Sequence, residues 1–169
     1  MLVNIKELSD HMYWADSKVW SEIKKISQDS NIQTILDLVY HLHSVQYAYL
    51  CIWKKESLAS LPKNEFKDIV EITVWGETIH NQFRTFLKSL DDIQLNNSIS
   101  IPWTKRVEKK IGRPAEKVSL LQSINQVILH STYHRGQINT KIRELGGEPP
   151  LTDFIYWIWI NKFDAEKLN

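Results

Sequence analysis

Hydrophobic residues recur at steps of three and four along most of this chain, which is the spacing of one face of an α-helix. Four such ladders stand out, and each follows a polar residue with Glu or Gln three positions later, the pattern of a helix-capping box. The pairs are Asn4 and Glu7, Ser30 and Gln33, Asp68 and Glu71, and Ser119 and Gln122. The pattern therefore predicts four long helices, over residues 5–27, 32–54, 68–90 and 119–145.

The connections between the ladders indicate how these helices pack. The first connection, residues 26–31, is short, so the first two helices are expected to be antiparallel neighbours. The connections 55–67 and 91–118 are long, which favours a crossover over simple up-down-up-down order. The predicted fold is an all-α four-helix bundle, with residues 1–169 as a single domain.

Two further segments are expected to be ordered. Between residues 99 and 111 apolar residues alternate with polar ones, which predicts a small β-hairpin inserted before the fourth helix. After Gly146 and Gly147, which end that helix, residues 153–161 predict a short apolar helix. Its stretch Phe154–Ile160 is apolar all round, so it either seals one end of the bundle or contributes to a dimer interface.

Composition and charge exclude several classes of protein. The chain has 21 Lys and Arg against 20 Asp and Glu, which is too balanced for the broad positive field of a nucleic-acid binder. The basic run at residues 105–113 is better explained as a solvated loop, although it could draw an anionic substrate. Cys51 is the single cysteine, which excludes an internal disulfide and a cysteine-based zinc site. With no apolar run long enough to span a bilayer and no secretory signal, we expect a cytoplasmic protein without a membrane partner.

The histidines carry the candidate chemistry. His130 and His134 are four residues apart, so they lie on one face of the fourth helix and can bind one metal ion together. The Glu of the zincin motif is missing between them. His41 of the second helix is expected to face the core at a similar height and to supply a third imidazole. His43 and His80 are expected to face outward, and Glu77 with His80 lacks the second copy that a di-iron site needs.

Several strings of this sequence resemble the DinB family, the damage-inducible DinB and YfiT-like proteins. They are MYWAD at 12–16, HLHSVQYAYL at 41–50, HSTYHRGQ at 130–137 and RELGGEPPLTDFIYW at 143–157. The resemblance implies an up-down-down-up four-helix bundle, often dimeric, with a divalent metal held by three histidines. The matching positions are His41, His130 and His134, and His41 fits better than His43 because of the spacing to the aromatic pair that follows.

The same resemblance implies a function but leaves the reaction open. The family's activities include metal-dependent transfer of low-molecular-weight thiols and isomerase chemistry. We therefore expect a metal-dependent enzyme, a hydrolase or a thiol transferase acting on a small molecule, with Zn²⁺ as the best-suited ion and Ni²⁺, Fe²⁺, Co²⁺ or Mn²⁺ as alternatives. A non-catalytic metal- or ligand-binding stress-response protein is the competing hypothesis. Tyr133 and Gln46 replace residues frequent in the family, which leaves the catalytic acid or base unassigned.

Overall fold

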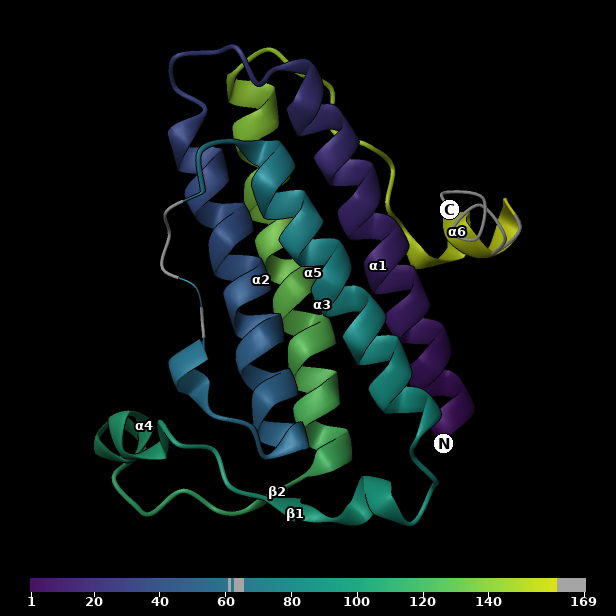
Figure 1. Ribbon diagram of the computed structural model, residues 1–169, viewed down its shortest axis with the longest axis vertical. Coiled ribbons are helices and arrows are strands. Elements are labelled where there is room, and N and C mark those ends of the chain that lie inside the picture. The colour runs from purple at the N-terminus through teal and green to yellow at the C-terminus, as the bar shows by residue number, and fades with distance from the viewer. Residues whose placement is uncertain (61, 63–65, 161–169) are drawn as a thin grey trace.

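The protein is mostly helical in the computed structural model, which describes residues 1–60, 62 and 66–160 (Figure 1). None of the described helices is both long enough and apolar enough to cross a membrane. The helices and strands, in chain order, are α1 (Leu2–Lys25), α2 (Gln33–Lys54), the 3₁₀ turn η1 (Leu58–Ser60), α3 (Ile69–Lys88), the 3₁₀ turn η2 (Gln94–Asn96), β1 (Ser98–Ile99), α4 (Thr104–Ile111), β2 (Val118–Ser119), α5 (Leu120–Glu144) and α6 (Phe154–Trp159).

Two of the four predicted caps are confirmed. The Asp68 side chain accepts from the N–H of Glu71 at the start of α3, and Ser119 forms a reciprocal capping box with Gln122 at the start of α5. The caps predicted for the first two helices are wrong. The start of α1 is capped from a distant loop, because the N–H of Leu2 donates to Oδ1 of Asp92, and α2 begins after Ile32 without a side-chain cap.

The four long helices lie side by side, with α1 and α5 running in one direction and α2 and α3 in the other (Figure 1). Helix α1 packs mainly against α3 and α5, and α2 packs mainly against the same two helices. Helices α1 and α2 are therefore antiparallel, as predicted, but they are diagonal partners rather than neighbours. Side chains bridge this diagonal through the centre, where the indole N–H of Trp20 donates to His43.

The long connection before α5 differs from the predicted hairpin. Its strands β1 and β2 are only two residues each, and they pair antiparallel with Ile99 opposite Val118. Part of the segment between them forms α4 (Thr104–Ile111), because Val107 and Ile111 are four apart and suit a helical stripe as well as an alternating one. No residue of α4 is buried, so the basic run lies on a solvated surface as expected.

The apolar core has two halves. One surrounds Met12 and Phe83 toward the N-terminus of α1, and the other surrounds Val39 and Ile72 toward its C-terminus. Between the two halves, each long helix contributes buried polar side chains at about mid-height. This polar layer, described below, brings α1, α2, α3 and α5 together.

The short helix α6 does not seal an end of the molecule. It lies beside α1, where its Trp157 is buried against Trp14 (Figure 1). Its outer side chains remain exposed, with 53% of Ile155 and 77% of Trp159 accessible to solvent. The alternative of an interface with a second chain therefore stays a prediction.

Two helix-interior glycines predict opposite effects of the same substitution. A Cβ at Gly76 would lie 2.8 Å from both the His43 and Trp20 side chains, whereas a Cβ at Gly136 would meet no atom within 4 Å. Alanine gains up to about 1 kcal/mol of helix propensity over glycine, while overpacking costs about 1–3 kcal/mol. Urea denaturation should show that Gly76→Ala lowers the free energy of unfolding and Gly136→Ala raises it. Stabilisation by both substitutions would contradict the close approach at Gly76.

Candidate functional site

The three predicted histidines come together between α2 and α5. His130 and His134 lie one turn apart on α5, and His41 approaches them from α2. Each ring offers one nitrogen, and these nitrogens all lie within 4.8 Å of one another. The ring centroids are 4.2 Å apart for His130 and His134, and 4.6 Å apart for His41 and His134. The structure thus assembles three imidazoles at one place.

This cluster lies at the surface rather than in the core. His41 is exposed, so the expectation that it faces the core is wrong, and the other two histidines are half-buried. The positions that point inward on α5 are Ser131 and Arg135, each one residue after a histidine. A single residue turns a helix by about 100°, which moves the imidazoles to the edge of the buried stripe. The cluster is consequently open to solvent on the side of His41.

The environment keeps two of these imidazoles neutral. Burial, together with smaller contributions from the nearby His134 and His41, lowers the pKa of His130 to about 4. Burial also lowers the pKa of His134, as does His41, while the hydrogen bond that the ring donates to Gln137 opposes the shift. The Nδ1 atoms of His130 and His134 are shielded and have no hydrogen-bond partner among the described residues. A neutral imidazole with a free nitrogen is the form that ligates a divalent metal.

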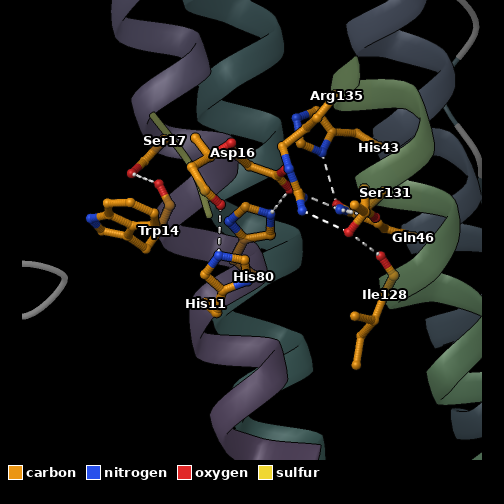
Figure 2. A network of polar contacts seen from close by, with 12 residues as sticks. His11, Trp14, Asp16, Ser17, His43, Gln46, His80, Ile128, Ser131 and Arg135 are labelled. Atoms are coloured by element: carbon orange, nitrogen blue, oxygen red, sulfur yellow. Dashed lines mark hydrogen bonds and ion pairs between the residues drawn. The ribbon is translucent and has the colours of Figure 1, made fainter. Parts of the chain in front are cut away.

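A second polar cluster occupies the layer between the two halves of the core (Figure 2). Asp16 of α1 is its centre and is 1% exposed. Its Oδ1 accepts from Nη1 of Arg135 at 2.8 Å, and its Oδ2 accepts from Nε2 of Gln46 at 2.9 Å and from Nε2 of His80 at 3.2 Å. Burial alone would raise the pKa of Asp16, but Arg135 and His80 hold it well below its usual range.

His43 completes this buried cluster. Its Nε2 accepts from the indole N–H of Trp20 at 3.1 Å, so its Nδ1 carries the proton and donates to Oε1 of Gln46 at 2.8 Å. Burial lowers the pKa of His43 to about 4. Gln46 also donates from Nε2 to Ser131 at 3.0 Å, which ties α2 to α5.

Asp16, His43 and His80 have the separations of a metal site, but their bonding indicates another role. Their potential ligand atoms lie within 4.8 Å of one another. Both nitrogens of His43 are already hydrogen-bonded, and the carboxylate already faces the guanidinium of Arg135. A further cation would replace these bonds and meet a buried positive charge. The cluster is therefore best described as an internal ion-pair and hydrogen-bond network.

The outward orientation predicted for His43 and His80 is wrong. They are 0% and 5% exposed. Their burial is tolerated because hydrogen bonds satisfy them, from Asp16 for His80, and from Trp20 of α1 and Gln46 of α2 for His43. His80 is stacked between Tyr13 and Trp20, with ring centroids 4.4 and 5.2 Å away. None of these partners is near it in the sequence, so helix periodicity alone could not identify them.

Three further polar residues lie outside the three-histidine cluster. His11 is a packing residue, with its Nε2 donating to the carbonyl of Thr152 at 2.9 Å. Asp37 is exposed and accepts from Gln33, so it lies on the surface of the first turns of α2. Gln46, which replaces a residue frequent in the resembled family, is fully buried in the network rather than facing the three histidines.

The sequence model of the DinB family matches residues 1–167. The chain is also similar to Protein DinB of Bacillus subtilis (strain 168), with 20% identity over 171 aligned positions that cover 92% of this chain and 94% of that protein. The match spans all four long helices and includes both histidine clusters.

The buried ion pair should dominate the stability of the protein. Replacing Asp16 by Asn leaves the charge of Arg135 buried without its counterion, which costs about 3–5 kcal/mol in comparable cases. Glu22→Gln is the matched control, because Glu22 pairs with Lys25 at the surface and such pairs contribute below about 1 kcal/mol. Urea denaturation followed by circular dichroism measures both changes. Similar small losses in the two variants would contradict the role of the network.

The same carboxylate predicts a pH dependence. Because the folded state lowers the pKa of Asp16 from its ordinary value of 3.8, the unfolded chain takes up this proton first as the pH falls. The stabilisation that ionised Asp16 contributes is fully present above a pH of about 3.8 and is lost progressively below it. The difference in unfolding free energy between the wild type and Asp16→Asn should therefore shrink between about pH 4 and about pH 2. A difference that stays constant over this range would show that Asp16 is not ionised in the folded protein.

Proposed function

The chain belongs to the DinB family, and from this premise we propose that it is a divalent-metal-dependent enzyme whose ion is held by His41, His130 and His134. We propose with it the fold that the resemblance implies, an up-down-down-up four-helix bundle in one domain. The observation that carries the proposal is the convergence of three imidazoles, two of which present shielded Nδ1 atoms without a partner.

The donor set fits such an ion. A shielded, unpaired nitrogen is unfavourable, and coordination is one way to satisfy it. The lowered pKa of His130 and His134 keeps their lone pairs available at neutral pH. All three donors are nitrogens, which suits Zn²⁺ and also Ni²⁺, Co²⁺ or Fe²⁺ more than Mg²⁺ or Ca²⁺. Three protein ligands are typical of catalytic zinc sites, which keep a position open.

The protein residues around the cluster define what a substrate would meet. His41 is exposed, so a small molecule can approach from the outer side of α2 and α5. The ring of Tyr133 is 65% exposed and stands edge-on to His134 at 5.2 Å, where it could contact a bound substrate. Gln137 hydrogen-bonds to His134 and orients its ring.

The reaction we propose is hydrolysis or the transfer of a low-molecular-weight thiol. A bound divalent ion would supply Lewis acidity, which lowers the pKa of water or of a thiol toward neutrality. Incubation of the zinc-loaded protein with thiol cosubstrates and electrophilic or ester substrates tests this proposal directly. Turnover that disappears in His134→Ala would support it.

One observation favours the alternative of a non-catalytic metal- or ligand-binding stress-response protein. The groups that perturb the pKa values of His130 and His134 are histidines and Gln137, with no carboxylate among them. A general base beside the ion is thus missing from these contacts. Metal binding without turnover across the substrate screen would favour this second function.

The proposed ligands predict which substitutions release the metal. His41→Ala, His130→Ala and His134→Ala should each weaken Zn²⁺ binding at least tenfold, because a tridentate site loses a donor. His43→Ala is the control from the buried cluster, and it should lower thermal stability while keeping full metal stoichiometry in folded protein. Competition with a chromophoric chelator measures the affinity. Full retention of zinc by His130→Ala and His134→Ala, with loss in His43→Ala, would assign the metal to the buried cluster instead.

We also propose that the chain forms a homodimer through the outer side of α6. The exposed Ile155 and Trp159 would be covered by a second chain. Light scattering at micromolar concentration should give twice the chain mass, and Trp159→Ser should shift it toward the mass of one chain. A monomer over the accessible concentration range would contradict this proposal.

A further inference from the structure

A groove of about 650 Å³ lies on the other flank of α5, between α5, α1 and the segment that leads into α6. The three-histidine cluster lies between α5 and α2, so the groove is a separate feature. Apolar side chains of three segments line it, and they are Leu8, Ile128, Leu129 and Phe154. Its volume is in the range of small-molecule sites, roughly 300–1,000 Å³.

Gly136 leaves open space along the groove. This residue lines the groove, and a Cβ built on it would meet no atom within 4 Å. A glycine in a helix interior is unfavourable by about 1 kcal/mol relative to alanine. Packing against another helix would explain such a glycine, but no neighbouring atoms are present at this position. The open space is therefore available to a ligand.

The charges that border the groove are already balanced. Arg135 is 3% exposed, and its guanidinium donates to Asp16 from Nη1 and to Thr132 Oγ1 from Nη2. His11 donates to the carbonyl of Thr152 and has its pKa lowered mainly by burial, so it is neutral near pH 7. The exposed carboxylate of Asp153 stands at the rim and disfavours an anionic head group. An uncharged ligand matches this lining best.

One polar atom of the lining lacks a partner. Asn139 borders the groove, and its Oδ1 is shielded from solvent with no hydrogen bond to the described part of the chain. Such an acceptor is unfavourable unless an N–H or O–H group reaches it.

We propose that this groove is a second ligand site, which takes an uncharged amphipathic small molecule. The apolar part of the ligand packs along Leu8, Ile128 and Phe154, and its hydroxyl or amide N–H donates to Asn139. Burial of the apolar part supplies the affinity, and the unpaired acceptor supplies the preference for a donor head group. The proposal does not depend on a metal at the three histidines.

Octyl glucoside is a suitable probe, because it joins an apolar chain to an uncharged head rich in hydroxyl groups. Titration calorimetry below its critical micelle concentration should show saturable binding of one molecule per chain. Octanoate carries the same length of chain with a negative head, which Asp153 repels, and should bind at least tenfold more weakly. Octyltrimethylammonium has no N–H or O–H to donate to Asn139 and should bind about fivefold more weakly. Equal affinity for all three probes would overturn the proposal by showing apolar adsorption only.

Three variants locate the binding. Gly136→Leu fills the groove and should weaken octyl glucoside binding at least tenfold, with the helical circular dichroism and zinc affinity unchanged. Gln126→Leu adds the same side chain at an exposed position of α5 outside the groove and should change nothing. Asn139→Leu removes the unpaired acceptor and leaves an apolar side chain of similar size. It should weaken octyl glucoside binding by about fivefold, the effect of one hydrogen bond.

Two outcomes would overturn the assignment. Unchanged binding in Gly136→Leu would place the probe elsewhere. A dimer that Gly136→Leu dissociates, measured by sedimentation, would show that a second copy of the chain occupies the groove. Loss of binding in Gly136→Leu and Asn139→Leu, with sedimentation unaffected, would support the ligand site.

Discussion

The ion pair between Asp16 and Arg135 is the constraint around which the rest of this structure is arranged. Both charges are buried at mid-height, where the two apolar halves of the core meet. Buried charges are tolerated only with complete pairing, so α1 and α5 must keep one register for the bond to form. Gln46 and His80 donate to the same carboxylate, which extends this requirement to α2 and α3 (Figure 2).

The network also helps to place the three surface histidines. Gln46 donates to Ser131, which is the residue after His130, and thereby fixes how α2 meets α5. His41 is on the same helix as Gln46 and lies beside His134 in this register. The two clusters differ in one respect that separates their roles: the buried one is bonded throughout, whereas His130 and His134 keep free nitrogens at the edge of the core. Stability and metal binding can thus be altered by different substitutions.

Features that depend on residues close together in the sequence could be predicted from the sequence alone. The capping residues of α3 and α5 precede their helices directly, and the spacing of His130 and His134 places them on one face whatever the helix contacts. The cap of α1 could not be found in this way, because Asp92 is supplied by the loop after α3. Likewise, His80 bonds Asp16 of α1, and His43 bonds Trp20 of α1 besides Gln46 of its own helix. The pattern of a single helix cannot show the partners on α1. The prediction for the direction of His41 is wrong because this residue lies beside the buried stripe, where a difference of one position separates core from surface.

Anomalous scattering from crystals grown with Zn²⁺ tests the central claim most directly, since it locates the ion without assuming a reaction. Data collected on both sides of the zinc absorption edge should give one strong peak between α2 and α5, within bonding distance of His41, His130 and His134. The space beside Asp16 should show none. A peak among Asp16, His43 and His80, with none at the surface cluster, would contradict the account, because the buried network would then be the metal site.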